Sequence, residues 1–295
     1  MKNGILFSFV AAGCLLASCT AAQTITPLED GQYRISLTDL SMTVDAQHGG
    51  RILSFKLGDA EILNQGTMPN SFGSTFWTSP QAEWRWPPVP EIDTQPYGAE
   101  VKDGALVLTS EKSERFGYRI RKRFEADPKD GAIVVTYTIV NESDQAKTVA
   151  PWEISRVANE GVVFFDAPAA EPANHMVGLP FTFSNGAAWY VMDEAAVNRK
   201  VNADGHGWLA YSANGLMLYK TFDDIDAAQA APGEAEIQVY VNVGKTYVEL
   251  EGQGAYTTLQ PGEALDWTVR WYLRKHTLQD APSEDLAVLA RQFIQ

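Results

Sequence analysis

Two glutamates lie close together in the stretch Lys245–Gln253, KTYVELEGQ. If this stretch is a strand, side-chain alternation places Tyr247, Glu249, Glu251 and Gln253 on one face. The two carboxylates would then lie about 6.6 Å apart, twice a rise of about 3.3 Å per residue. Two acids at that distance repel, and in a cleft the pKa of one should rise, which suits a general acid or base. The alternative is a solvated outer face.

Charged residues also interrupt two apolar stretches. The stretch Val149–Val157, VAPWEISRV, contains Trp152, Glu153 and Arg156. Such residues inside an apolar strand are typical of a binding or catalytic site. The alternative is a structural ion pair between Glu153 and Arg156. Lys220 is a third lone charge in an apolar stretch, and it is solvated, paired or functional.

The segment Thr75–Pro90, TFWTSPQAEWRWPPVP, concentrates tryptophan and proline. Each proline removes a backbone donor, so we expect no helix here and no central strand. The indoles of Trp77, Trp84 and Trp86 either pack on the core or form a platform on which a ligand stacks. We expect a platform at Trp84 or Trp86 and a core position for Trp77.

Several catalytic and metal-binding motifs are absent from the sequence. It has no phosphate-binding glycine-rich loop, no His-Glu-x-x-His, no Gly-x-Ser-x-Gly and no paired-cysteine metal site. An acidic cluster at Asp223, Asp224 and Asp226 could hold calcium, but it lacks the glycine and distal glutamate of a calcium loop, so a solvated turn explains it. We expect neither a metal nor a cofactor. The four histidines are single and scattered: His48, His175, His206 and His276.

The elements that would position these residues are strands. Period-two alternation predicts strands at Tyr33–Leu37, Ser41–Ala46, Arg51–Leu57, Ala105–Ser110, Tyr118–Ala126, Ile133–Asn141, Leu216–Phe222, Glu236–Asn242 and Leu265–Arg274. The dipeptides between several of them tolerate the positive φ of tight hairpins. These are Asp103-Gly104, Asp130-Gly131 and Asn214-Gly215, and Pro261-Gly262 suits a type II turn.

One helix and two long irregular stretches complete the expected organisation. The helix is Asp285–Phe293, with Ser283 as its N-cap. The irregular stretches are Asn64–Tyr97 and Ala167–Ala187, and long loops of this kind are often functional. The sequence therefore predicts one antiparallel all-β domain over residues 31–295, with a short C-terminal helix.

The N-terminus is expected to be a lipoprotein signal peptide. Residues 1–18 combine a positive start with an apolar run, and Leu16-Ala17-Ser18-Cys19 matches the bacterial lipobox. Lipidation of Cys19 would anchor the protein in a membrane without spanning it, through a tether at residues 19–30. Thr20 rather than aspartate follows, which favours the outer membrane of the bacterial envelope, facing the periplasm or cell surface. The alternative is an ordinary secretory signal.

The composition argues against one class of partner. The chain has a formal net charge of −14. Nucleic acids and anionic lipid surfaces would repel a protein of this charge. We therefore expect no nucleic-acid partner, and we expect a monomer.

Several motifs together resemble a known family. Gly49-Gly50-Arg51-Ile52-Leu53-Ser54-Phe55 looks like an early strand of galactose-mutarotase-like (aldose 1-epimerase) domains, and Leu250-Glu251-Gly252-Gln253 resembles the region of their catalytic glutamate. The sequence is most similar to the DUF4380 group of that superfamily. Its members combine a Ser-Thr-Phe-Trp…Ser-Pro-Gln…Trp-Pro-Pro segment with Pro-Trp-Glu-Ile-x-Arg and Glu-x-Gln-Gly-x-Tyr strands. The resemblance spans most of residues 40–275.

The resemblance implies a β-supersandwich of two large antiparallel sheets with a sugar cleft on one concave face. It implies that Glu251 removes the proton of an anomeric hydroxyl. The histidine that protonates the ring oxygen in mutarotases has no counterpart in the matching stretch Ala150–Arg156. Glu153, His206 or His175 could replace it.

Three hypotheses follow for function. The first is a carbohydrate-binding lipoprotein that acts at an anomeric centre through Glu251, on a mono- or oligosaccharide that could be acidic. The second is a non-catalytic structural or assembly lipoprotein. The third is a glycan lyase or hydrolase with paired carboxylates. Convergence of Glu251 and Glu153 on one pocket beside a tryptophan would support the first hypothesis, and placement on opposite faces would mean that it fails. The side chains expected to contact sugar are Arg51, Trp77, Trp84, Trp86, Trp152, Arg156, His175, Lys220, Glu249 and Gln253.

Overall fold

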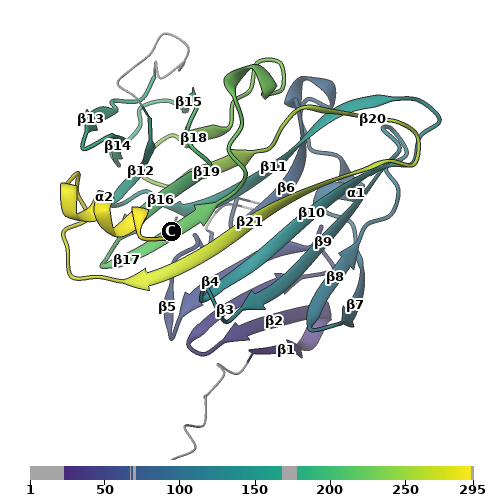
Figure 1. Ribbon diagram of the computed structural model, residues 1–295, viewed down its shortest axis with the longest axis horizontal. Coiled ribbons are helices and arrows are strands. Elements are labelled where there is room, and N and C mark those ends of the chain that lie inside the picture. Colours follow the sequence, from purple (N-terminus) through teal and green to yellow (C-terminus); the bar gives the residue numbers. More distant parts are fainter. Residues whose placement is uncertain (1–22, 67, 69–70, 168–177, 294–295) are drawn as a thin grey trace, which may run out of the picture.

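The computed structural model describes residues 23–66, 68, 71–167 and 178–293. Two large antiparallel sheets lie face to face, and Figure 1 shows their strands crossing the molecule as two layers. Strands cover about half of the chain and helices very little. The predicted all-β supersandwich with one short C-terminal helix is therefore confirmed.

The first sheet runs in the order β1-β2-β3-β4-β6-β11-β19-β18-β15, with β5 beside β4 and β20 beside β11. Neighbouring strands are antiparallel throughout. Its strands are β1 (Gln23–Pro27), β2 (Gln32–Leu37), β3 (Leu40–Asp45), β4 (Arg51–Leu57), β5 (Ala60–Glu61), β6 (Ser74–Ser79), β11 (Lys147–Ala158), β15 (Arg199–Ala203), β18 (Ile237–Val241), β19 (Tyr247–Gln253) and β20 (Thr257–Leu259).

The second sheet runs in the order β13-β14-β12-β16-β17-β21-β10-β9-β8-β7. Its strands are β7 (Gly98–Lys102), β8 (Ala105–Thr109), β9 (Tyr118–Asp127), β10 (Ala132–Asn141), β12 (Val162–Asp166), β13 (Thr182–Ser184), β14 (Ala187–Val191), β16 (Trp208–Ala213), β17 (Leu216–Thr221) and β21 (Ala264–Lys275). Short 3-10 turns lie at η1 (Glu29–Gly31), η2 (Gln81–Glu83) and η3 (Ala227–Gln229).

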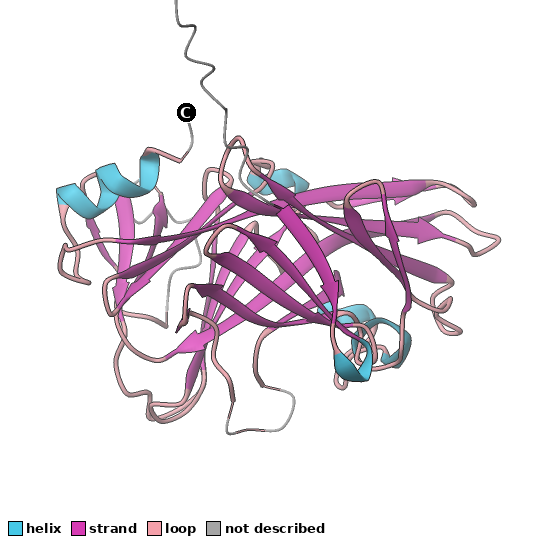
Figure 2. Ribbon diagram, turned by 90° about the horizontal axis from the view of Figure 1, so that it is seen from below, coloured by secondary structure: helices cyan, strands magenta, loops and turns pink. Residues whose placement is uncertain are grey.

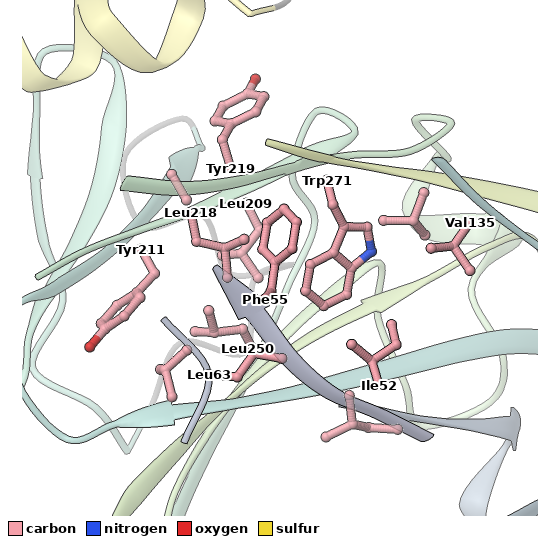
Figure 3. Close-up of a cluster of buried hydrophobic side chains, with 14 of the residues drawn as sticks. Ile52, Phe55, Leu63, Val135, Leu209, Tyr211, Leu218, Tyr219, Leu250 and Trp271 are labelled. Atoms are coloured by element: carbon pink, nitrogen blue, oxygen red, sulfur yellow. The ribbon is translucent and has the colours of Figure 1, made fainter. Parts of the chain in front are cut away.

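The main core lies between the inner faces of the two sheets. Figure 3 shows Phe55 of β4 beside Trp271 of β21, with Leu250 of β19 and Leu218 of β17 close by. The rings of Phe55 and Trp271 meet edge to face, with centroids 5.3 Å apart. Such contacts bury large apolar surfaces from both layers and hold the sheets together.

The predicted strands and turns occur where the alternation places them, with ends that shift by one or two residues. Asn214 and Gly215 join β16 to β17 with φ of +54° and +70°. Asp103 and Gly104 join β7 to β8 in the same way, with φ of +49° and +76°. The left-handed backbone that these dipeptides tolerate is therefore what each hairpin uses.

The C-terminal helix α2 (Glu284–Arg291) covers part of the outer face of the second sheet. Ser283 accepts a hydrogen bond from the backbone N of Leu286 at 3.2 Å, which confirms the predicted N-cap. Just beyond the helix, the ring of Phe293 packs 5.3 Å from that of Tyr219 in β17. Figure 2 shows α2 at one end of the sandwich, outside the layers of strands.

The tryptophan- and proline-rich segment is more regular than predicted. Its first residues belong to β6, a fully buried strand with neighbours on both sides. The prediction failed because the first proline of the segment is Pro80, so every donor of β6 is intact. Pro90 begins a one-turn helix, α1 (Pro90–Asp93), where a missing backbone N–H has no helical partner to lose.

A glycine pair lets α1 approach the first sheet closely. Gly49 has φ of +66°, and a Cβ there would lie 2.0 Å from the carbonyl oxygen of Asp93. Its backbone N also donates to the carbonyl of Gln95 at 2.9 Å. Only glycine fits this position without displacing α1.

Part of the expected tether is structured. Gln23–Pro27 forms β1, which pairs along its whole length with β2. The ordered sheet thus begins inside residues 19–30, while Cys19 and the expected signal peptide lie outside the described residues. In the part of the chain that the structure describes, no helix has the length and apolar character to cross a membrane.

Candidate functional site

A pocket of about 660 Å³ lies on the outer face of the first sheet. Strands β4, β6, β11, β15, β18 and β19 contribute to it, and the tryptophan- and proline-rich segment forms its rim. We call it the sheet pocket. Its lining residues are Arg51, Ser71, Trp77, Gln81, Trp86, Pro87, Pro88, Pro90, Asp93, Thr94, Trp152, Arg156, Lys200, Tyr240, Tyr247, Glu249 and Glu251.

The register of two central strands decides which charged groups enter this pocket. Residues directly opposite on antiparallel neighbours point to the same face. Between β11 and β19, Arg156 is opposite Glu249 and Trp152 is opposite Gln253. Glu251 therefore shares the pocket face with Trp152 and Arg156, as the alternation in Lys245–Gln253 predicted for its two glutamates.

Glu251 lies at the floor of the sheet pocket and is only 1% exposed. Its Oε2 accepts hydrogen bonds from Trp152 Nε1 at 2.9 Å and from Lys200 Nζ at 3.0 Å. Its Oε1 is buried and has no hydrogen-bond partner among the described residues. One carboxylate oxygen is thus held by the protein, and the other has no protein partner among the described residues.

Burial raises the pKa of Glu251 to about 7. The Lys200 ammonium opposes this rise, while the negative charge of Glu249 adds to it. A carboxyl group with a pKa near neutrality can both take up and release a proton under physiological conditions. The expected rise in one of the two carboxyl pKa values is therefore found at Glu251.

The cations of the pocket are paired with acids. Arg156 Nε lies 2.9 Å from Glu249 Oε1, and the Arg156 guanidinium lies 5.8 Å from the centre of the Trp77 ring. The Lys200 ammonium, which binds Glu251, lies 4.9 Å from the centre of the Trp152 ring. Arg156 and Lys200 therefore each contact an acid and an indole ring, and these contacts hold the acid and the ring in place.

The third cation, Arg51, lies near Asp93 at the end of α1. Asp93 Oδ1 accepts a hydrogen bond from Trp77 Nε1 at 2.7 Å and lies 3.8 Å from Arg51 Nη2. Because Gly49 has no Cβ, the backbone of Asp93 can lie against it in this position. The one-turn helix α1, which begins at the last residue of the tryptophan- and proline-rich segment, thus supplies an acid to the site.

The three neighbouring tryptophans occupy different environments. Trp84 is buried, donates from Nε1 to the carbonyl of Thr78 at 2.8 Å, and does not line the sheet pocket. Trp77 is also buried but borders the pocket, whereas Trp86 is 71% exposed at its rim. Of the two tryptophans expected to form a platform, only Trp86 is exposed, so a platform there stays a prediction, and Trp77 is both core and pocket wall.

Glu153 lies on the opposite face of β11, between the two sheets, and is 1% exposed. Its carboxylate accepts from Lys220 Nζ at 2.8 Å, Tyr137 Oη at 2.7 Å and Trp271 Nε1 at 3.3 Å. It does not converge with Glu251 on one pocket, so the form of the first hypothesis in which both acids serve one sugar site fails, and only Glu251 lines the sheet pocket. The expectation that Glu153 and Lys220 contact a ligand in the cleft is therefore wrong, as is the alternative Glu153–Arg156 ion pair.

The remaining candidates lie away from the sheet pocket. His206 has a 61% exposed side chain, 3.9 Å from Asp224, and borders a different hollow. Gln253 is buried and is not among the pocket-lining residues. His175 lies outside the described residues. Within the described ranges, no group of three or more His, Cys, Asp or Glu side chains could hold a metal ion.

Sequence reasoning missed several residues of the pocket, among them four with side chains that can bond a ligand. Lys200, Tyr240 and Tyr247 enter it from the strands on one side, and Asp93 enters from α1. Lys200 is 51 positions from the glutamate that it binds, so no local pattern connects them. The alternation of Lys245–Gln253 places Tyr247 on the same face as Glu249, which was the available signal for that residue.

Comparison with known proteins shows similarity in structure. No model of a known protein family and no curated protein matches the sequence. A candidate aldose 1-epimerase from Escherichia coli K12 superposes with a TM-score of 0.58 and 13% identity, over 86% of this chain and all of that chain. A galactose mutarotase-like protein from Lactobacillus casei superposes with a TM-score of 0.56 and 13% identity, over 83% of this chain and all of that chain.

A TPR-domain containing protein from Parabacteroides distasonis is similar to a comparable degree. Its TM-score is 0.59 with 12% identity, over 90% of this chain and 54% of that chain. The same sandwich thus occurs alone and as part of a longer protein. The chain therefore has a galactose mutarotase-like fold, which is the fold that the resemblance implied.

Proposed function

We propose that this protein binds a carbohydrate in the sheet pocket and acts on its anomeric centre through Glu251. The observation that carries the proposal is the free oxygen of Glu251, which is buried at the floor of a pocket walled by indoles. Indole faces pack against the apolar faces of sugars, and the surrounding acids and cations can bond hydroxyl groups. The galactose mutarotase-like fold supports a carbohydrate ligand by analogy.

The pocket contains the groups that anomer interconversion needs. Glu251 Oε1 would accept the proton of the anomeric hydroxyl while the bond between the anomeric carbon and the ring oxygen breaks. The ring oxygen must gain a proton, and the Lys200 ammonium at the same carboxylate can donate it. The open-chain aldehyde then closes on its other face as both protons return. Lys200 thereby fills the role for which no histidine is present in the stretch Ala150–Arg156.

The motifs shared with the DUF4380 group support membership of that group. Ser74–Trp77 lies in β6, Pro151–Arg156 in β11 and Glu251–Gln253 in β19. These three strands are adjacent in the first sheet and together form much of the pocket floor. Several residues that carry the resemblance therefore line the site, namely Trp77, Trp152, Arg156 and Glu251.

The lipobox supports a location in the bacterial envelope. Lipidation at Cys19 would leave only a few residues before the edge strand β1, which begins at Gln23. The sandwich would then be held close to the membrane, as a monomer anchored in the outer membrane. Radiolabelled palmitate incorporation that is lost in Cys19→Ala would support this location, and incorporation that persists would contradict it.

A glycan lyase or hydrolase with paired carboxylates is the second candidate. Glu249 and Asp93 are the other acids that line the pocket beside Glu251 among the described residues, and they lie next to Arg156 and Arg51 respectively. With Glu153 on the other face, this candidate would have to pair Glu251 with one of these two acids. Formation of new reducing ends or unsaturated products from glycans would favour it over anomer interconversion.

The test is a screen of monosaccharides and glycans against the purified full chain, with hits followed by NMR of anomer interconversion. We expect at least one sugar to bind and Glu251→Gln to slow interconversion by about 10²-fold or more. Glu236→Gln is the matched control, because Glu236 is equally buried but does not line the pocket. Failure of every sugar to bind would sink the proposal and favour a structural lipoprotein. Binding with unchanged interconversion in Glu251→Gln would remove Glu251 as base.

A further inference from the structure

A second hollow of about 780 Å³ adjoins the sheet pocket. We call it the outer hollow. Trp86, Pro87, Pro88 and Pro90 border both cavities, so these residues form a ridge between them. A ligand that fills the sheet pocket therefore meets this ridge where it leaves the pocket.

The ridge presents an aromatic ring to solvent. Trp86 is the most exposed of the large apolar residues in the described ranges, at 71%. The centre of its ring lies 6.1 Å from that of Trp77 at an interplanar angle of 81°. The Trp86 ring is therefore nearly perpendicular to the Trp77 ring, which lines the sheet pocket. The prolines that follow restrict the backbone, and a rigid aromatic platform loses little entropy on binding.

The walls of the outer hollow are tied together by specific contacts. Arg115, which lies between β8 and β9, donates to the carbonyls of Glu83 at 2.9 Å and Trp84 at 3.3 Å. Glu91 accepts a hydrogen bond from the backbone N of Glu114 at 2.9 Å. Loops from both sheets are thereby joined around the hollow, which gives it a defined shape beside the ridge.

The charges of both cavities favour an uncharged ligand. In the sheet pocket, Arg51, Arg156 and Lys200 are balanced by Asp93, Glu249 and Glu251. An anionic ligand would have to displace one of these acids from its cation. The outer hollow is lined by more acids than cations: Glu91, Glu111 and Glu114 against Lys112 and Arg115. The expectation of an acidic sugar is therefore not favoured by the pocket charges.

We infer that the ligand is a linear oligosaccharide of uncharged sugar residues that crosses Trp86 and occupies both cavities. This inference rests on the proposed function, in which Glu251 acts on an anomeric hydroxyl. Only the reducing end of such a chain carries a free anomeric hydroxyl. The reducing-end residue therefore lies in the sheet pocket, the next residue stacks on Trp86, and the following residues enter the outer hollow.

Calorimetric titration of the full chain with oligosaccharides of one to five residues tests this inference. The neutral probes are β-1,4-, β-1,3- and α-1,4-linked glucose and β-1,4-linked mannose, and the acidic probe is α-1,4-linked galacturonic acid. We expect affinity for one neutral series to rise about tenfold from one to three residues, which is the contribution of about one good aromatic contact. The acidic series should bind more weakly at equal length.

Variants at the ridge separate stacking from other contacts. Trp86→Ala should remove the gain with chain length, and Trp86→Phe should keep most of it. Val197→Ala, at another exposed apolar side chain that borders neither cavity, should change nothing. Stronger binding of the acidic series would overturn the assignment of an uncharged ligand.

Different experimental results would contradict the oligosaccharide inference and the proposed function. If monosaccharides bind as tightly as longer chains, or if Trp86→Ala keeps the gain with length, the oligosaccharide inference is overturned while the proposed function stands. If no probe of any length binds here or in the wider screen, the proposed function fails and the inference fails with it.

Discussion

Glu153 and Glu251 lie on neighbouring strands of the same sheet, and each is 1% exposed, yet their surroundings differ. Glu153 points between the sheets, where Lys220, Tyr137 and Trp271 bind its carboxylate. Glu251 points outward into the sheet pocket, and one of its oxygens has no partner among the described residues. A buried charge is costly unless it is paired and hydrogen-bonded. Full pairing at Glu153 therefore indicates a structural role, whereas the unpartnered oxygen of Glu251 is the group that the proposed function uses.

The same contrast separates Trp84 from Trp86, two residues apart in the chain. Trp84 is enclosed and hydrogen-bonded through its indole, whereas Trp86 is open to solvent at the pocket rim. Residue type and sequence neighbourhood are nearly the same for both. The environment of the side chain, and not its type, therefore distinguishes an indole that packs in the core from one that is open to a ligand.

The largest effect is expected from Lys220→Met, which leaves the charge of Glu153 buried without its cation. Removing one member of a buried ion pair costs about 3–5 kcal/mol. Urea unfolding should show a loss of this size, and the double variant Glu153→Gln/Lys220→Met should recover much of it. A loss below about 1 kcal/mol would mean that Glu153 does not depend on this pairing.

Trp84→Ala should also destabilise strongly, by about 3–5 kcal/mol, because it removes a buried indole from the core. Trp86→Ala should change the free energy of unfolding by less than about 0.5 kcal/mol, since the side chain is exposed. Thermal and urea unfolding of the two variants side by side give the comparison. Equal losses would contradict the assignment of Trp84 to packing and Trp86 to binding.

The raised pKa of Glu251 should affect stability with pH in a defined direction. With a pKa of about 7 in the folded state and an ordinary value of 4.5, the folded protein holds a proton that the unfolded chain releases between these values. The contribution to stability is therefore present below pH 4.5 and is lost as pH rises to about 7. Glu251→Gln should lack this loss, so the variant gains stability relative to wild type between pH 4.5 and 8. An unchanged difference across that range would contradict the raised pKa.

Catalysis by Glu251 should show the complementary dependence on pH. The base is active when ionised, so the rate of anomer interconversion should rise through about pH 7 and then level off. NMR exchange measurements on a sugar identified in the binding screen would give this profile. A rate that falls over the same range would mean that the protonated carboxyl is the active form.

The smallest effect is expected from His206→Ala. Its side chain is largely exposed, and its nearest acid, Asp224, is 3.9 Å away. Stability should stay within about 0.5 kcal/mol of wild type, as for most surface substitutions, and sugar binding should not change. Lost binding in this variant would place the histidine in the function after all and would weaken the assignment of proton donation to Lys200.

Much of the fold could be predicted from local patterns. Alternation located strands such as Arg51–Leu57, and dipeptides such as Asn214-Gly215 located the hairpins, because both depend on neighbouring residues. Pattern reasoning failed at Ser74–Ser79, where prolines that begin just after the strand obscured a central position in the sheet. It also gave no indication that Lys200 would reach Glu251.

Local patterns in the sequence were enough to predict an antiparallel all-β domain and to place Glu249 and Glu251 on one face of a strand. Alternation determines which residues of one strand point the same way, because that property is local. The pairing of distant strands determines that this face opens to the sheet pocket and that Glu153 points the other way. That choice depends on the register between β11 and β19, which are distant in sequence, and a shift of one residue would exchange the two faces.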